Sequence, residues 1–454
     1  MEALLEPLRE LAEIEEIQNE KKKEAGLIQI TGCVGSQKTH LTCALGSDCK
    51  YKLIVTSGES KAKQMYEEYR FLKETVYLYP AKDLLFYHAD LRGKQLVSSR
   101  METIQALLLG EGCTVITTFD AFMDSLLPIE TIRERVFSLK VGDIIDFEKV
   151  QKDLTLLGYE REVQIEGPGQ FAVRGGILDV YPLTEEVPVR IELWDDEIDS
   201  IRTFDVESQR SIENLEEITI YPASEFMDEK TKRVSFLDYF PREDTLLFLE
   251  EPARLIEQGE AVEAEFIESM KKRVETGCEV SDEEAKLFAP KEIASKMNQY
   301  PGIGLSILEG KRNLFHVKKS IHLQVKGVNP YNNSFETLTR DLARLKRSGY
   351  RVILLSGSRT RAKRLAEDLR DYSLSSFYSE EMDREVKPGE IMVAYGHVDE
   401  GYEYPLLKFI VISETDIFGK KKKKKKRKTY EGQKIQKLLD LKVGDYVVHE
   451  NHGL

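Results

Sequence analysis

The chain has 454 residues, a net charge of −14, 41% hydrophobic residues and 32% charged residues, a balance typical of globular proteins. This length predicts three or four domains that can each bury a core. No apolar run of about 18 residues occurs, and the first thirty residues contain Glu and Lys where a signal peptide would be apolar. The sequence therefore predicts a soluble cytoplasmic protein and excludes a membrane-spanning one.

Positive charge is concentrated in one segment. Lys420 to Lys428 is a run of nine basic residues, so the rest of the chain carries a net charge of −23. An acidic body disfavours general nucleic-acid binding, because phosphate contacts need Lys and Arg on the contacting surface. The run itself is typical of a solvated, self-repelling linker. Weak contact with DNA or RNA, without reading sequence, is the alternative.

Cysteine and histidine patterns give no sign of a metal. The five cysteines have no CxxC spacing and are expected to be free core thiols; they are Cys33, Cys43, Cys49, Cys113 and Cys278. The HENH segment at residues 449–452 lacks the i, i+4 spacing of a helical zinc motif. We therefore expect no metal site.

A glycine-containing loop follows the first predicted strand. Residues 1–24 have apolar side chains at helical spacing and predict one amphipathic helix, and Gly26 to Ile30 predicts a short strand. The next residues, TGCVGSQKTHL, lead into a predicted helix, which is the context of a phosphate-binding loop. The candidate phosphate-loop residues are Gly32, Gly35, Lys38 and Thr39.

Two features argue against ATP hydrolysis at this loop. Gln37 occupies the second glycine position of GxxxxGK[ST], where a side chain resists the close wrap of backbone N–H groups around phosphate. No acidic DExx segment is expected to end a strand nearby, since Val115 to Phe119 leads only to Asp120 and Ala121. The sequence favours a degenerate loop with no bound cofactor. An active ATPase is the alternative.

Strand and helix patterns divide the chain into three structural regions. Strands expected at residues 52–56, 76–79 and 114–117 alternate with helices and predict a parallel, P-loop-like (RecA-like) α/β sheet. From about residue 136, shorter strands predict an inserted β-rich α+β domain. Strands expected at residues 351–356, 390–394 and 408–413, with helices at 335–346 and 358–372, predict a further small α/β domain.

One hairpin and the strand after it predict an interaction surface. Residues 167–181, GPGQFAVRGGILDVY, indicate a β-hairpin with Arg174 at its tip. In the strand expected at residues 187–194, one face carries Val189, Ile191 and Leu193 and the other carries Arg190, Glu192 and Trp194. If the first face is core, the only tryptophan is exposed beside an arginine, and both residue types are enriched at interface centres. The alternative is that Trp194 packs beneath a loop.

Several long segments resemble a known family. PGQFAVRGGILDVYP, with VRIELWDDEIDSIRTFDVESQRS, resembles the module shared by the excinuclease protein UvrB and bacterial transcription-repair coupling factors. GHVDEGYEYPLLKFIVISETDIFG and VGDYVVHENHGL resemble the coupling factors alone. The resemblance implies the N-terminal, UvrB-like region of that family, followed by the start of its RNA-polymerase-interacting domain.

The resemblance also implies domain boundaries. Domain 1, with a degenerate nucleotide-binding fold, is expected at residues 1–135 and 223–325, and domain 2, which binds the excinuclease protein UvrA, at residues 136–222. The remaining expected units are a small α/β domain 3 at 326–418, a basic linker at 419–437, and the truncated start of the RNA-polymerase-interacting domain at 438–454.

The implied function is recruitment. The resemblance implies a non-catalytic platform that brings UvrA to lesions where RNA polymerase has stalled, in nucleotide excision repair, through Arg174, Arg190 and Trp194. RNA polymerase and double-stranded DNA are expected partners of the full-length protein, whose C-terminal motor would use ATP and magnesium. The alternative is a UvrB-like ATPase that loads on damaged DNA. The interval from Tyr87 to Arg100 is too short for the long aromatic hairpin of UvrB.

Overall fold

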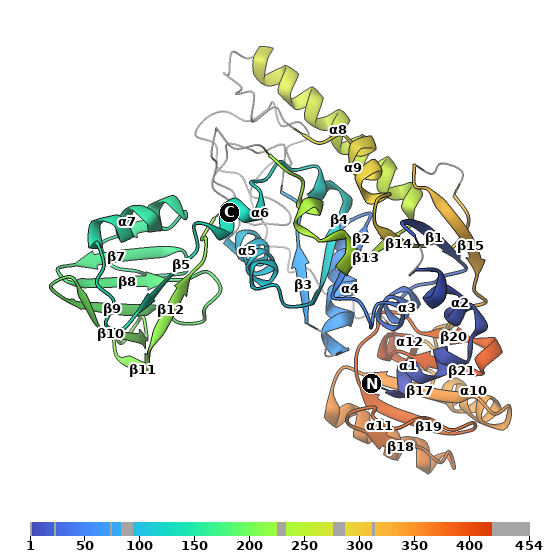
Figure 1. The fold of residues 1–454 in the computed structure, drawn as a ribbon. Helices are drawn as coiled ribbons and strands as arrows, with labels where there is room; N and C mark the ends of the chain where they lie inside the picture. The colour runs from blue at the N-terminus through green and yellow to red at the C-terminus, as the bar shows by residue number, and fades with distance from the viewer. Residues whose placement is uncertain are drawn as a thin grey trace.

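The structure, a computed structural model, describes residues 2–21, 24–72, 75–82, 94–224, 233–275, 287–310 and 314–419. Within these residues, three larger sheets follow one another across the molecule (Figure 1). A six-stranded sheet (the β-rich sheet) lies at one end, a seven-stranded sheet (the large sheet) in the middle, and a second six-stranded sheet (the C-terminal sheet) at the other end. Cys278, the basic run at 420–428, residues 438–454 and residues 87–93 of the 87–100 interval lie outside the described residues.

The large sheet is parallel throughout, in the order β15-β1-β14-β13-β2-β4-β3. Its strands are β1 (Gly26–Thr31), β2 (Tyr51–Thr56), β3 (Val76–Tyr79), β4 (Cys113–Thr118), β13 (Thr245–Glu250), β14 (Pro301–Leu305) and β15 (Val317–His322). Central parallel strands are buried on both faces and therefore read as apolar runs. The prediction of a parallel α/β sheet is confirmed.

Helices cover both faces of the large sheet and create two core clusters. One cluster includes α3 (Gln37–Leu45) and α4 (Glu59–Phe71), and the other includes α5 (Lys94–Leu109), α8 (Pro252–Glu275) and α9 (Pro290–Met297). The short elements around the second cluster are η2 (Phe119–Phe122), α6 (Ile129–Arg133), η3 (Phe236–Tyr239) and η4 (Arg242–Asp244). No helix in the described ranges is long and apolar enough to cross a membrane.

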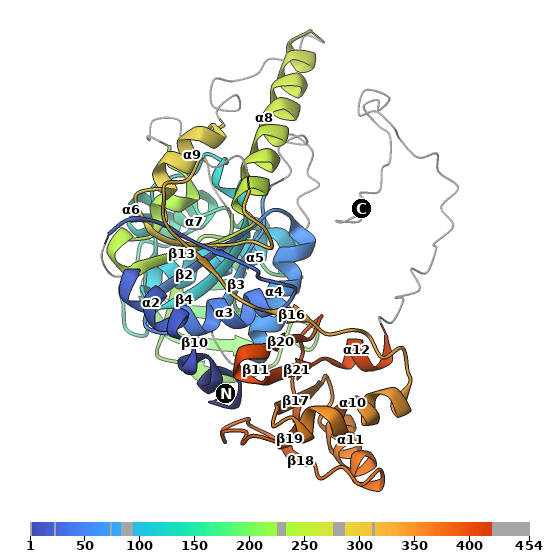
Figure 2. The same ribbon diagram turned by 90° about the vertical axis from the view of Figure 1, so that its right-hand side faces the viewer.

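The N-terminal segment is three short helices, so the expectation of one continuous amphipathic helix is wrong. They are α1 (Glu2–Leu5), η1 (Glu6–Glu10) and α2 (Ala12–Glu20). Pro7 begins a tighter turn, and Leu11 is extended (φ −83°, ψ 121°), which interrupts the helical hydrogen bonds. The apolar side chains are nevertheless buried, as Leu8 and Ile17 show. Figure 2 places these helices between the large and C-terminal sheets.

The β-rich sheet is inserted in the chain between β4 and β13 and has the order β11-β10-β9-β8-β7-β6. Its strands are β6 (Glu160–Glu162), β7 (Gln170–Arg174), β8 (Ile177–Tyr181), β9 (Val189–Trp194), β10 (Glu197–Phe204) and β11 (Ser211–Leu215). Helix α7 (Phe147–Leu156) covers one face through Val150 and Leu154. A separate antiparallel pair, β5 (Phe137–Lys140) with β12 (Glu217–Ile220), lies at the two ends of the inserted segment, where the chain enters and leaves it.

The C-terminal sheet has the order β16-β20-β21-β17-β19-β18. Its strands are β16 (Lys326–Gly327), β17 (Arg351–Ser356), β18 (Phe377–Ser379), β19 (Ile391–Tyr395), β20 (Tyr402–Tyr404) and β21 (Phe409–Ile412). Its helices are α10 (Phe335–Arg347), α11 (Arg359–Asp371), η5 (Pro405–Leu407) and α12 (Glu414–Phe418). The strands and helices expected between residues 335 and 413 are confirmed to within a few residues.

Candidate functional site

Arg174, Arg190 and Trp194 lie on one face of the β-rich sheet. Register places Arg174 opposite Ile177, and Ile177 opposite Glu192. Directly opposed residues of antiparallel strands share a face, and alternation along β9 adds Arg190 and Trp194 to that face. We call this side of the sheet, away from α7, the outer face. The sequence prediction of two different faces along β9 is confirmed.

The two arginines share one buried carboxylate, which sequence reasoning did not identify. Arg190 donates from Nε to Asp179 Oδ1 at 2.7 Å and from Nη2 to Oδ2 at 2.9 Å. Arg174 Nη2 donates to the same Oδ2 at 2.7 Å. The side chain of Asp179 is 2% exposed, against 12% for Arg190 and 44% for Arg174. Two guanidinium groups around one carboxylate leave this three-residue cluster with a net positive charge.

Arg190 is held on several sides. Its hydrogen bonds to Asp179 raise the pKa of its guanidinium above the usual value, although burial opposes the shift. Nη2 also donates to Gln209 Oε1 at 2.8 Å, and the guanidinium carbon lies 4.2 Å from the centre of the Phe204 ring. These contacts fix the side chain. Arg190 is therefore a largely buried, fixed residue of the outer face, whereas Arg174 has more of its side chain in solvent.

Trp194 ends β9 and is 80% exposed, so the alternative that it packs beneath a loop is wrong. Asp195, with φ 60°, begins the turn into β10, and Glu197 pairs with Trp194 across that turn. Glu197 also forms an antiparallel bridge with Ile144, whose side chain is 75% exposed. Ile144, Glu197 and Trp194 consequently form one row across three neighbouring chain segments.

Ile144 was not a candidate in the sequence. It follows VGD in a turn, and an isolated isoleucine there carries no periodic signal. Its place beside Glu197 depends on backbone pairing between segments about fifty residues apart, including a bond from Ile145 N to Asp196 O of 2.9 Å. Large apolar side chains exposed on one row are an interaction feature that only the folded chain shows.

The glycine loop between β1 and α3 contains two residues in the left-handed region, Gly32 (φ 83°) and Gly35 (φ 42°). The first N–H groups of the loop form hydrogen bonds within the protein. Gly32 N donates to Ile307 O at 3.1 Å, and Cys33 N donates to Ser306 O at 3.0 Å. Both acceptors lie just after β14, so these two donors are not available to wrap a phosphate.

Lys38 lies between two carboxylates at the end of β13. Its Nζ is 2.6 Å from Glu250 Oε1 and 2.7 Å from Glu251 Oε1. Burial alone would lower the pKa of Lys38, but the two carboxylates outweigh burial and raise it. Glu250 and Glu251 form an acidic pair at the end of a strand near the loop, although their sequence, EEPA, does not match the DExx pattern. Only β14 separates β13 from β1, although the two strands lie about two hundred residues apart in sequence.

Thr39 and Ser36 bind a third carboxylate, that of Glu68. Ser36 Oγ donates to Glu68 Oε1 at 2.5 Å, and the Thr39 hydroxyl donates to the other oxygen. Residues 399 and 400 cap this arrangement, with Asp399 N donating to Glu68 Oε1 at 3.1 Å and Glu400 N to Ser36 Oγ at 3.1 Å. The cavity beside them has a volume of about 20 Å³, which holds a water molecule but no triphosphate.

Gly35 also has a steric role. A Cβ built on this residue would lie 2.6 Å from a Glu400 carboxylate oxygen. The glycine thus lets a segment of the C-terminal region pack directly on the loop. An acidic side chain therefore occupies the space beside a turn where a nucleotide would place its own negative charge.

A hydrogen-bonded chain joins the loop to β20 and to the N-terminal helices. Gln37 Nε2 donates to the Tyr404 hydroxyl at 3.0 Å, and that oxygen lies 3.2 Å from His40 Nδ1. His40 Nε2 lies 2.7 Å from Leu4 O, and because a carbonyl only accepts, Nε2 carries the proton and Nδ1 accepts from Tyr404. Burial lowers the pKa of His40 to about 4, although the bond to Leu4 opposes the shift.

Comparison with known proteins gives one match to the β-rich region and others to nearly the whole chain. Residues 137–226, which include the outer face, match the family model described as the UvrB interaction domain. The chain is 28% identical, over 94% of its length, to the transcription-repair-coupling factor of Bacillus subtilis (strain 168). The chain is related to the transcription-repair-coupling factors. The corresponding proteins of Staphylococcus haemolyticus (strain JCSC1435) and Staphylococcus aureus (strain MRSA252) are 26% and 27% identical over 94% and 84% of the chain.

These coupling factors are longer proteins. The chain spans 41% of the Bacillus subtilis coupling factor and 37% of the Staphylococcus aureus one. The family-model match begins in β5 and ends just after β12, so it contains the β-rich sheet and α7. The resemblance of the sequence to the N-terminal region of the coupling-factor family is thereby confirmed.

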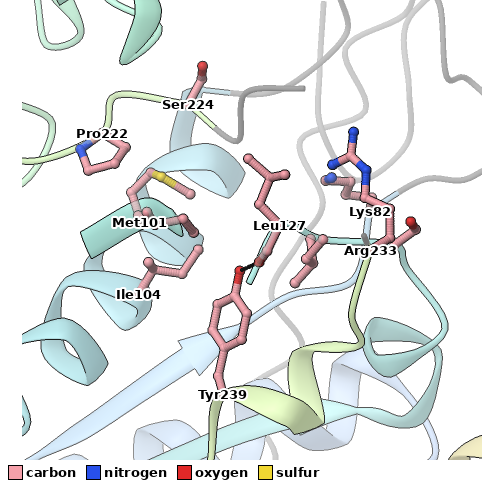
Figure 3. Close-up of a pocket in the computed structure, with 11 residues that line it drawn as sticks. Lys82, Met101, Ile104, Leu127, Pro222, Ser224, Arg233 and Tyr239 are labelled. Carbon is pink, nitrogen blue, oxygen red and sulfur yellow. Dashed lines mark hydrogen bonds between the residues drawn. The ribbon is translucent and has the colours of Figure 1, made fainter. Parts of the chain in front are cut away.

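A second small cavity lies beside α5, with Pro222 and Ser224, which follow β12, on its border (Figure 3). Apolar side chains of Met101, Ile104 and Leu127 line it, with Lys82 and Arg233 at one side. The Tyr239 hydroxyl donates to Leu127 O at 2.6 Å. The volume is about 20 Å³, so this cavity also holds no more than a water molecule or two.

The cysteines and acidic residues give no metal site in the described ranges, where no group of three or more His, Cys, Asp or Glu is placed to hold an ion. Within the described residues, Cys33, Cys43 and Cys113 are buried and outside any disulfide, whereas Cys49 is half-buried. Burial raises the pKa of Cys33 to about 12, which keeps it an unreactive thiol at neutral pH. The HENH segment at 449–452 lies outside the described residues.

Proposed function

We propose that this chain is the N-terminal, non-catalytic platform of a transcription-repair coupling factor and that its outer face recruits the excinuclease protein UvrA. The recruitment would take place at lesions where RNA polymerase has stalled, in nucleotide excision repair. The observation that carries the proposal is the position of Trp194, 80% exposed, on the same face as Arg174 and Arg190 within the UvrB interaction domain match.

The chemistry of the outer face suits a protein partner. Trp and Arg are enriched among the residues that contribute most to binding, and an exposed tryptophan can bury a large area on a partner. Ile144 extends the apolar part of the surface along the same row. Arg174, 44% exposed, can pair with acidic groups of UvrA while Asp179 keeps its direction.

The proposal includes the domain boundaries. Residues 1–135 and 223–325 form domain 1, 136–222 form the UvrA-binding domain 2, and 326–418 form domain 3. Residues 419–437 are a basic linker, and 438–454 begin an RNA-polymerase-interacting domain. RNA polymerase, double-stranded DNA, ATP and magnesium are proposed for the full-length protein, which is cytoplasmic.

The alternative function is an active ATPase, and one observation favours it. Lys38, Thr39 and the Glu250–Glu251 pair bring together the residue types of a nucleotide-hydrolysing site in a RecA-like fold. We favour a degenerate loop, because Gln37 fills the second glycine position and binds Tyr404. The carboxylates of Glu68, Glu250, Glu251 and Glu400 would also repel a triphosphate.

Two experiments test these functions. In a pull-down with immobilised UvrA, the wild-type chain should be retained, and absence of retention would contradict the recruitment proposal. In a phosphate-release assay, the wild-type chain with ATP and magnesium should release no phosphate above a protein-free control. Release that disappears in Lys38→Met would support the ATPase instead.

A further inference from the structure

A second surface lies at the opposite end of the molecule from the outer face. It is a cleft of about 510 Å³ between α10 and residues 327–331, bordered by Glu403 of β20. Figure 1 shows α10 at the far end from β7, β8 and β9. The volume falls in the range of ligand-binding clefts and exceeds that of a single bound ion. Neither the outer face nor the glycine loop contributes to it.

Three arginines line this cleft from one side of α10: Arg340, Arg344 and Arg347. Their spacing of four and three residues puts them on one helix face, and all three are exposed. With a rise of 1.5 Å per residue, Arg340 and Arg344 are about 6 Å apart along the helix axis and Arg347 is about 4.5 Å further. The opposite side of α10, with Leu338 and Leu342, is buried in the core.

The acidic groups of the cleft already have partners. Asp341 accepts from the Tyr331 hydroxyl at 2.9 Å and from Arg344 Nε at 2.9 Å. Glu403 accepts from the Tyr350 hydroxyl at 2.7 Å. These bonds leave the cleft with more positive than negative groups able to meet a ligand.

The outer two arginines are available to a ligand. Within the described ranges, Arg340 has no hydrogen bond or ion pair, and Arg347 donates from Nε only to Ala343 O, at 3.2 Å within its own helix. A guanidinium group presents five N–H donors in a plane, which suits phosphate oxygens. Arg340 and Arg347 therefore retain most of their donors for an anion with more than one charged group.

The covalent position of the basic run points to a polyanion. Tyr331 N donates to Asp416 O at 2.7 Å and Asn333 N to Ile417 O at 2.9 Å, so the rim of the cleft is fixed to α12. The sequence continues two residues after α12 into the nine basic residues at 420–428. Cationic residues thus occur both in the cleft and in the sequence that follows α12. A ligand with a single carboxylate could not contact both sets, whereas a polyanion could.

We propose that this cleft binds the phosphodiester backbone of a nucleic-acid strand, with Arg340 and Arg347 as its phosphate contacts. Backbone binding of this kind depends on charge and is indifferent to base sequence. The proposal is independent of UvrA recruitment. It also assigns contacts to folded residues that are separate from the lysine run.

The test is fluorescence anisotropy with a labelled single-stranded oligonucleotide of about 20 bases, measured over a range of salt concentrations. Arg340→Ala/Arg347→Ala is compared with Lys149→Ala/Lys152→Ala, which removes the same charge from exposed positions on α7. The arginine variant should lose about 1.4 from the slope of log K against log salt, at about 0.7 for each lost contact, whereas the control should keep the wild-type slope.

Four results would overturn the proposal. They are an unchanged slope in the arginine variant, an equal loss in both variants, absence of wild-type binding, and tighter binding of an acidic peptide of equal charge than of the oligonucleotide. Because all four substituted residues are exposed, circular dichroism should show wild-type folding in both variants. A third variant with residues 420–428 changed to serine separates the lysine run: its binding should remain sensitive to Arg340→Ala/Arg347→Ala.

Discussion

Arg190 and Asp179 face each other across β8 and β9, joined by hydrogen bonds of 2.7 Å and 2.9 Å that use both carboxylate oxygens. The pair lies directly below the exposed part of the outer face. Its carboxylate is almost fully buried and also receives Arg174. This geometry makes one of the proposed binding residues a structural residue as well.

Arg190→Ala should destabilise the β-rich sheet by about 2–3 kcal/mol, because Asp179 would keep only Arg174 as a charged partner. Hydrogen exchange of β8 and β9 amides measures this locally. Arg174→Ala should cost less than about 1 kcal/mol, since that side chain is largely exposed. If the β8 and β9 amides were equally protected from exchange in Arg190→Ala and Arg174→Ala, the Arg190–Asp179 pair would not stabilise the sheet.

Lys38→Met should lower the free energy of unfolding by about 3–5 kcal/mol, because Glu250 and Glu251 would lose their shared cation in a largely buried site. Urea denaturation followed by circular dichroism measures the loss. The double variant Lys38→Met/Glu250→Gln should recover part of it by removing one uncompensated charge. If Lys38→Met were as stable as wild type, Lys38 would have no structural role.

The buried His40 should make stability depend on pH. Its pKa is about 4 in the folded chain and about 6.5 when unfolded, so the unfolded state binds more protons between these values. Stability is fully present above pH 6.5 and falls as pH drops toward 4, by up to about 3 kcal/mol. His40→Gln should flatten this part of the curve in thermal unfolding. A wild-type slope in that variant would assign the pH dependence to other groups.

Ile144→Ser should weaken the complex with UvrA by about tenfold while leaving the melting temperature unchanged, because Ile144 is 75% exposed. Leu156→Ser is a matched control, since it is also an exposed apolar residue (58%) but lies on α7, on the other side of the sheet. Surface plasmon resonance compares the two. Equal weakening in both variants would argue against a contact specific to the outer face.

Local patterns in the sequence predicted much of this architecture. Apolar runs predicted the parallel strands, and alternation along β9 predicted that Trp194 and Arg190 share a face. These features depend on neighbouring residues and on the two-residue period of a strand. The outer face can accordingly be predicted from β9 alone, without the register between β8 and β9.

The remaining features depend on contacts between distant residues. Lys38 pairs with Glu250, and Gln37 with Tyr404, across separations of 212 and 367 residues. Sequence periodicity does not indicate contacts between distant residues, so it did not predict that Glu250 and Glu251 at the end of β13 bind Lys38. Asp179 could have been suspected as a lone acidic residue in an apolar strand, because a buried charge requires a partner.

The proposed role of the outer face in recruitment is tested most directly by calorimetric titration of UvrA with the wild-type chain and with Trp194→Ala. Trp194 is exposed and contributes little to folding, so the substitution separates binding from stability. The wild-type chain should bind with measurable heat, and Trp194→Ala should weaken the affinity by at least about thirtyfold, roughly 2 kcal/mol. Wild-type affinity in a folded Trp194→Ala variant would contradict the proposal that this face recruits UvrA.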